Sequence, residues 1–182
     1  MNPRTEARLE KVKRMSHSGR RVCLLLMALL SLAGTVEVFG TLAMPETQTC
    51  EVGGLRQPCS ELPPEVVTLT VVGMVGAVAL ILTALYRLAR LFQNYARGEI
   101  FTRASVREIR FLGYLAVASA VFQVMLFVAA LVLVAGVRRA EWPADLQFDF
   151  PIGTLVMAMF VLLLAWIMDI GAEMREENEL TV

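Results

Sequence analysis

Residues 111–137 have the sequence FLGYLAVASAVFQVMLFVAALVLVAGV, a run of 27 residues without a charged side chain. As a helix, at 1.5 Å rise per residue, this run is about long enough to cross the ~30 Å hydrocarbon layer of a bilayer. Its apolar residues do not alternate with period two, as those of a membrane barrel strand would. Since only helices and closed barrels satisfy their backbone groups in lipid, the run predicts a membrane-spanning helix.

Three further apolar runs share this character and occupy residues 22–44, 66–85 and 152–168. The chain has 182 residues, of which 57% are hydrophobic, and a mean hydropathy of +0.61, so it is too apolar for an ordinary soluble domain. We therefore predict an all-α integral membrane protein, a four-helix bundle. A basic segment (1–21) precedes one four-span domain (22–182), which ends in an acidic tail (169–182).

The basic residues are distributed unevenly around the four runs. Seven lie before the first run, six lie between the second and third, and one lies in the tail, whereas the other two connecting loops carry three in total. The positive-inside rule then places both termini in the cytoplasm, together with the connection between spans two and three, and makes this a multi-pass protein of the plasma membrane. A cleavable signal peptide with Arg20 and Arg21 as its basic region is the rival interpretation. The long charged segment before the run, and the continuation of the run to residue 44, argue against it.

Residues 1–21 have the pattern of a basic amphipathic helix, since Leu9, Val12 and Met15 recur at helical spacing. Such a segment can lie on anionic inner-leaflet lipids, or it can be a solvated signal for topology, and both interpretations stay open. We expect a hinge at residues 16–19, before the first span.

Two of the three cysteines, Cys50 and Cys59, lie in the loop between the first two spans. If that loop faces an oxidising compartment, we expect a disulfide between them, worth roughly 2.5–3 kcal/mol in the chain-entropy model. Two free thiols are the alternative. A metal site is not expected, because no histidine or further cysteine lies nearby. Cys23, in the first turn of a span, is expected to act as a small apolar residue.

Glu37 is the one acid well inside an apolar run, and an ionisable group there suggests a function. Counted from the start of each run, Glu37 in span one and Gln123 in span three fall at similar depths, about 22 Å and 18 Å. The two side chains could therefore form a hydrogen bond inside the bundle. This hydrogen bond, or extension of the Glu37 side chain toward the outer face, is the structural interpretation. A proton or ion relay is the functional alternative.

The connection between spans two and three is predicted to be a helical hairpin beyond the membrane surface. Span two keeps its helical period to Gly98, and Ser105 and Glu108 suggest a capping box at the start of the next helix. The arginines of this hairpin, as candidate contacts for a partner or for lipid, are Arg87, Arg90, Arg97, Arg103, Arg107 and Arg110. The acids of the tail, expected to pair with them permanently or as a latch, are Glu173, Glu176, Glu177 and Glu179.

Two blocks of sequence resemble a known family. The first comprises LF (91–92), GEIFT (98–102) and VREIRFLG (106–113), and the second comprises WIMD (166–169) and REENELTV (175–182). They resemble a bacterial four-span family catalogued as domain of unknown function 2975. The resemblance implies a bacterial inner-membrane protein, and a small helix-turn-helix DNA-binding regulator as a partner. The loop that holds Cys50 and Cys59 is not part of the pattern.

The chain offers little for catalysis, so we expect no enzyme, no catalytic residue and no cofactor. Its single histidine, His17, lies outside the spans, and neither a phosphate-binding glycine loop nor an HExxH motif is present. We predict a regulatory or interaction module that presents the arginine-rich hairpin and the acidic tail to a soluble partner. The alternative is a small-solute or ion transporter or channel that uses Glu37. Direct nucleic-acid binding is not expected, because the anionic bilayer competes for the arginines, and a homo-oligomer stays open.

Overall fold

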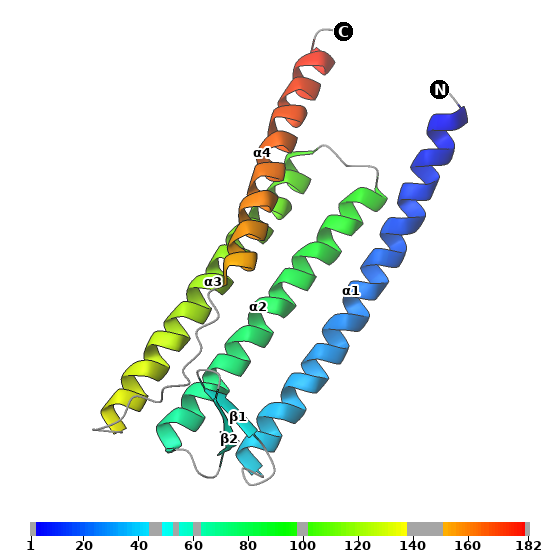
Figure 1. Cartoon of the computed structure of the whole chain (residues 1–182). Helices are drawn as coiled ribbons and strands as arrows, with labels where there is room; N and C mark the ends of the chain where they lie inside the picture. The colour runs from blue at the N-terminus through cyan, green and yellow to red at the C-terminus, as the bar shows by residue number, and fades with distance from the viewer. Residues whose placement is uncertain are drawn as a thin grey trace.

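The computed structural model describes residues 3–43, 49–52, 55–59, 63–97, 102–137 and 151–180. These residues form four helices and one small sheet (Figure 1). The helices are α1 (Pro3–Ala43), α2 (Pro64–Ala96), α3 (Arg103–Val137) and α4 (Ile152–Leu180), and the strands are β1 (Thr49–Val52) and β2 (Leu55–Pro58). The all-α class with four helices is confirmed.

Each helix contains a stretch long and apolar enough to cross a membrane: Met15–Ala43, Pro64–Ala96, Arg103–Leu133 and Ile152–Met174. Large apolar side chains cover the outside of these stretches instead of filling an interior. Leu25 is 70% exposed, Phe39 71% and Met159 69%, whereas the buried core consists mostly of small residues. Exposed apolar surface on this scale fits a lipid environment and would aggregate in water. The chain is a multi-pass membrane protein.

The helices pack in chain order, α1 on α2, α2 on α3, and α3 on α4. Glycines allow the close approaches. A Cβ atom on Gly34 of α1 would lie 3.1 Å from Val78 of α2, and a Cβ on Gly73 of α2 would lie 3.1 Å from Leu126 of α3. Small residues let backbones approach where lipid provides no hydrophobic drive for helix association.

α1 runs without a break from Pro3 to Ala43, so the expected hinge at residues 16–19 is wrong. The glycine of that segment does not interrupt the helix, because it lies in the contact of α1 with α2. Ser16 is buried, and a Cβ on Gly19 would lie 3.1 Å from the ring of Phe92. The glycine therefore serves close packing at this point.

The connection between α1 and α2 contains an antiparallel hairpin that the sequence analysis did not predict. β1 pairs with β2 in a register that sets Thr49 opposite Pro58 and Cys50 opposite Gln57. Cys59 follows β2 directly and is buried, with 2% of its surface exposed. The side chain of Cys50 lies outside the described residues, so the disulfide stays a prediction.

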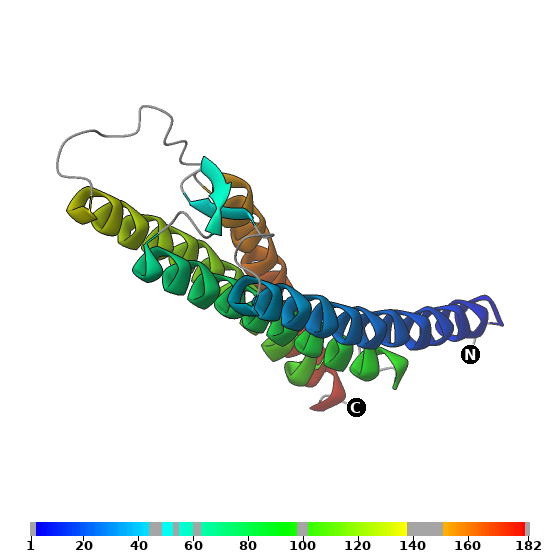
Figure 2. The same cartoon turned by 90° about the horizontal axis from the view of Figure 1, so that it is seen from below.

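Charged segments gather at one end of the molecule. The N-terminal part of α1, the last turns of α2, the first turns of α3 and the C-terminal part of α4 lie at that end, and β1 and β2 lie at the opposite end (Figures 1 and 2). This arrangement follows from four successive crossings. It brings together residues that are far apart in the sequence, and we call this part of the molecule the charged end.

Candidate functional site

The charged end is organised around a buried carboxylate, Glu108 of α3, whose side chain is only 6% exposed. Its two oxygens bind two arginines of α2. Arg87 Nη1 donates to Glu108 Oε2 at 3.0 Å, and Arg90 Nε lies 3.3 Å from Glu108 Oε1. Arg87 and Arg90 are three residues apart, so they lie on the same side of their helix. One acid therefore joins α2 to α3 through two charge-assisted contacts and leaves the cluster with one net positive charge.

Arg87 has a second contact that fixes its guanidinium group. Its Cζ lies 4.0 Å from the centre of the Phe111 ring, one helical turn after Glu108. A cation over an aromatic face is attracted by the ring quadrupole. The side chain of Arg87 is 28% exposed and that of Arg90 is 56% exposed, so Arg87 is the inner and Arg90 the outer partner of Glu108.

α3 begins three residues earlier than the capping box at Ser105 and Glu108 would require, so that expectation is wrong. Arg103 is the first helical residue, and the Thr102 hydroxyl accepts a hydrogen bond from the Ser105 backbone N–H at 3.4 Å. Thr102 is therefore the N-cap, a position that favours threonine. Ser105 is fully buried, and Glu108 is turned toward α2 instead of capping its own helix.

Below the ion pairs, three helices share an apolar cluster. Its buried members are Leu91 of α2, Ile109 of α3 and Ala165 of α4. Partly buried apolar residues pack around them: Leu88, Tyr95, Val161 and Met168. At the same level a Cβ on Gly113 would lie 2.6 Å from Leu162 Cδ2, so α3 and α4 approach closely here. This packing fixes the relative positions of the helices that carry the arginines of α2 and α3.

A further ion pair joins α3 to α4. Arg110 Nη2 donates to Asp169 Oδ2 at 2.6 Å, and the two side chains are 44% and 36% exposed. Asp169 is the first residue of the predicted tail, but the structure continues α4 through it to Leu180. This pair lies one helical turn before Glu173, which is exposed. The side chains of Glu176, Glu177 and Glu179 lie outside the described residues, so their pairing with the hairpin stays a prediction.

The remaining hairpin arginines lie on the surface of the charged end. Arg97, at the C-terminus of α2, and Arg103 and Arg107, in the first two turns of α3, are all exposed. The six predicted contact arginines thus fall into two groups. Three bind Glu108 or Asp169 and join helices, and the other three are exposed on the surface. Of the exposed arginines, Arg97 and Arg107 can turn their charge toward another molecule without first breaking an ion pair with Glu108 or Asp169.

The family follows from a match that includes this whole site. A family model described as "Protein of unknown function (DUF2975)" matches residues 40–182. The chain belongs to this family. No curated protein and no solved structure is detectably similar to it. The match excludes residues 1–39, so most of α1 lies outside the part that the DUF2975 model describes.

In this DUF2975 member, Glu37 and Gln123 are not brought together. The contact of Gly34 with Val78 and that of Gly76 with Phe122 place both residues at nearly the same level of α2. However, α1 and α3 pack against α2 from different sides, and both side chains are exposed. Among the described residues, Glu37 has no ion pair and its side chain has no hydrogen bond, although its carbonyl accepts one from Thr41 at 2.9 Å.

Sequence reasoning missed the role of Glu108, Asp169 and Phe111. One signal was available for Glu108, because it is the single acid between the start of α3 and residue 137 and arginines lie on both sides of it. An acid with arginines on both sides in the sequence is expected to form ion pairs with arginines instead of capping its own helix. Asp169 offered no comparable signal, since its partner precedes it by 59 residues.

Proposed function

We propose that this chain is a non-enzymatic membrane module that presents its charged end to a soluble protein. The observation that supports this most directly is the division among the hairpin arginines. Glu108 and Asp169 hold three of them in ion pairs between helices, whereas Arg97 and Arg107 are exposed on the same end of the molecule. A rigid surface with exposed like charges favours binding, because little conformational entropy is lost in ordering that surface when a partner binds.

The proposal includes an orientation. In the sequence, fourteen lysines and arginines lie before span one, between spans two and three, or after span four, and three lie in the other two connections. The positive-inside rule then supports a cytoplasmic charged end, with both termini inside a bacterial inner membrane. The hairpin of β1 and β2 would face outward, where a disulfide between Cys50 and Cys59 can form and persist.

A partner for this surface must carry acidic groups, because exposed arginines attract opposite charge and select against basic partners. A soluble helix-turn-helix regulator, which the family resemblance suggests, is the partner we propose. The complex would be regulatory, in that it holds the regulator at the membrane and away from DNA. Arginines at a rim mainly raise the association rate, so the affinity should fall as the salt concentration rises.

Co-purification from mild detergent tests the proposal. The double variant Arg97→Glu with Arg107→Glu reverses two exposed charges and leaves the pairs of Glu108 and Asp169 intact. We expect it to lose a soluble protein that the unmodified chain retains at low salt. Glu65→Lys is the control, because it also changes the charge of an exposed residue but lies in the first turn of α2, at the opposite end. Equal recovery of the same soluble proteins with the double variant would contradict the proposal, as would recovery of none by the unmodified chain.

A further inference from the structure

An apolar groove runs along the line where α1 and α2 meet. It consists of two adjoining hollows of about 520 and 500 Å³, which share Ser31 of α1 and Leu82 of α2. The groove extends along α1 from Met27 to Leu42, a distance of about 22 Å. One leaflet contributes about half of the ~30 Å hydrocarbon layer, so the groove is long enough to hold an acyl chain from the interface to the bilayer centre.

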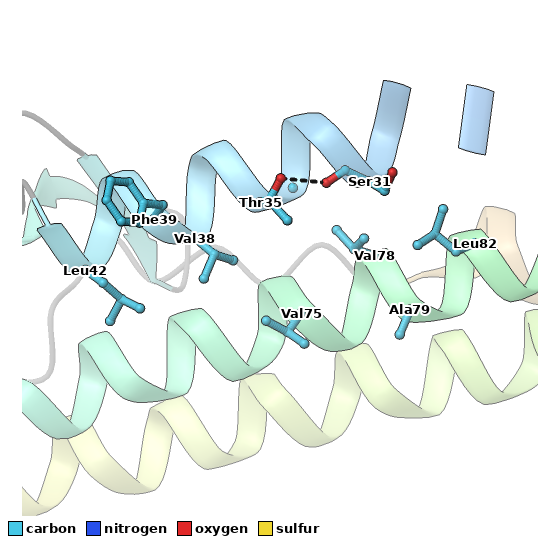
Figure 3. A pocket seen from close by; sticks show the side chains of 10 residues that line it. Ser31, Thr35, Val38, Phe39, Leu42, Val75, Val78, Ala79 and Leu82 are labelled. Atoms are coloured by element: carbon cyan, nitrogen blue, oxygen red, sulfur yellow. Dashed lines mark hydrogen bonds between the residues drawn. The ribbon is translucent and has the colours of Figure 1, made fainter. Parts of the chain in front are cut away.

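The groove owes its depth to small side chains and its apolar surface to local hydrogen bonding. Gly34 and Ala79 lie among its lining residues, and Ala79 is labelled on α2 in Figure 3. The serine and threonine hydroxyls of the lining are already satisfied, because Ser31 donates to the Ala28 carbonyl at 2.9 Å, Thr35 to the Leu32 carbonyl at 2.8 Å and Thr83 to the Ala79 carbonyl at 2.7 Å. An apolar occupant therefore leaves none of these hydroxyls without a partner.

Polar groups lie beyond one end of the groove. Tyr86, 57% exposed, lines the end nearer the charged end of the molecule. Arg90 follows Tyr86 by four residues on α2, so it continues the same stripe of the helix about one turn further. On α1 the stripe of lining residues Ser31, Ala28 and Met27 continues at helical spacing to Arg20, which is exposed.

The packing of α1 on α2 sets these two arginines at the same height. Gly19 lies against Phe92, and Gly34 lies against Val78, so the antiparallel register is known at two points. Arg20 is one residue beyond Gly19, and Arg90 is two residues before Phe92, a difference of about one residue rise, or ~1.5 Å. Packed helix axes are about 8–10 Å apart, which two arginine side chains can bridge through a common anion.

We propose that this groove binds an anionic phospholipid, with an acyl chain between α1 and α2 and the headgroup phosphate between Arg20 and Arg90. The charges at a single end of an otherwise apolar groove match an amphiphile better than they match a second membrane helix. The guanidinium of Arg90 contacts Glu108 through Nε while its side chain stays 56% exposed, so it can bind a phosphate without leaving Glu108. This inference does not depend on the proposed soluble partner.

Native mass spectrometry of the full chain, released from mild detergent with added phosphatidylglycerol or phosphatidylcholine, tests the proposal. Both headgroups carry the phosphate, but the quaternary ammonium of choline is repelled by the two arginines. We therefore expect the unmodified chain to retain phosphatidylglycerol with about tenfold higher affinity than phosphatidylcholine. Arg20→Gln should remove that preference, and it leaves Arg90 bound to Glu108. Arg107→Gln, another exposed arginine, should keep the preference.

Filling the groove tests the position of the acyl chain. Ala79→Phe should reduce the retention of both lipids several-fold, whereas Ala77→Phe should not, because Ala77 is an exposed residue of α2 that does not line the groove. Circular dichroism checks that both variants remain helical. Equal retention of lipid by the two variants would overturn the proposal. So would a dimer that Ala79→Phe dissociates, since a second copy would then occupy the groove.

Discussion

Replacing Glu108 by alanine should destabilise the chain more than any other single change at the charged end. The substitution removes the one acid between Arg87 and Arg90 and leaves the inner arginine, 28% exposed, beside Phe111 without an opposing charge. Removing one member of a buried ion pair costs about 3–5 kcal/mol, because the remaining charge stays desolvated. The hydrogen bond from Arg87, at about 1.5–3 kcal/mol, and the outer ion pair with Arg90, at about 0–1 kcal/mol, give a sum of roughly 1.5–4 kcal/mol, which overlaps that range.

The exposure of the two arginines predicts an order among the variants. Arg90 is 56% exposed and returns easily to solvent, so Arg90→Gln should cost about 1 kcal/mol or less. Arg87→Gln should cost more, because it leaves the buried Glu108 with only its outer partner. Glu108→Gln should lie between Glu108→Ala and Arg90→Gln, since the amide oxygen can still accept one hydrogen bond.

Unfolding in mixed detergent micelles, followed by circular dichroism, measures these free energies. Glu173→Ala is the control, because it removes an exposed acid from α4. We expect its free energy of unfolding to stay within about 0.5 kcal/mol of that of the unmodified chain. If the free energy of unfolding of Glu108→Ala also stayed within about 0.5 kcal/mol of that of the unmodified chain, the ion pairs of Glu108 would not stabilise the packing of α2 on α3.

Three further predictions concern the other contacts. Gly113→Ala should destabilise the chain by about 1–3 kcal/mol in the same assay, because its Cβ would overlap Leu162. Gly153→Ala should not, because nothing lies within 4 Å of its Cβ. Similar free energies of unfolding for both variants would contradict the close approach of α3 and α4. Reversing the charge of either Arg110 or Asp169 should lower the free energy of unfolding by roughly 0–1 kcal/mol, and exchanging both charges should restore it. A double-mutant cycle measures this. If the exchange did not restore the free energy, the pair would contribute nothing to stability. The intact mass of the non-reduced protein should be lower than that of the reduced protein by two hydrogens, as one disulfide between the loop cysteines requires, and equal masses would refute the bond.

The sequence was sufficient to predict the four helices, because a membrane-spanning run depends only on local composition and length. Glu108 shows why the site was harder. Its contacts with Arg87 and Arg90 depend on how far α2 slides along α3, and no local pattern states that register. The structure sets it through Gly73 and Gly76, whose missing side chains accept residues of α3. Small residues could be recognised in the sequence, but the partner that fills each space could not.

The unbroken α1 illustrates a second limit of local patterns. Serine and glycine at residues 16–19 lower helix propensity, which favours a break there in an isolated segment. In the folded chain the contact of Gly19 with the Phe92 ring stabilises a continuous helix, and a larger residue at that point would require the ring to shift. Tertiary packing therefore outweighs a cost of about 1 kcal/mol for one glycine in a helix.

The helices are joined in different ways along their length, and the reason lies in the solvent. Within the apolar stretches, contacts such as Gly34 with Val78 bring the helix backbones close. Lipid tails solvate an exposed leucine as well as another helix does, so close packing at small residues is what favours helix association there. At the charged end, ion pairs such as that of Arg87 with Glu108 take over. There, water can solvate the outer arginines while the inner carboxylate stays buried. A charge pair moved into the hydrocarbon layer would lack that solvation. Glu37, the acid that does lie there, has no ion pair among the described residues, so the helices are not joined through it.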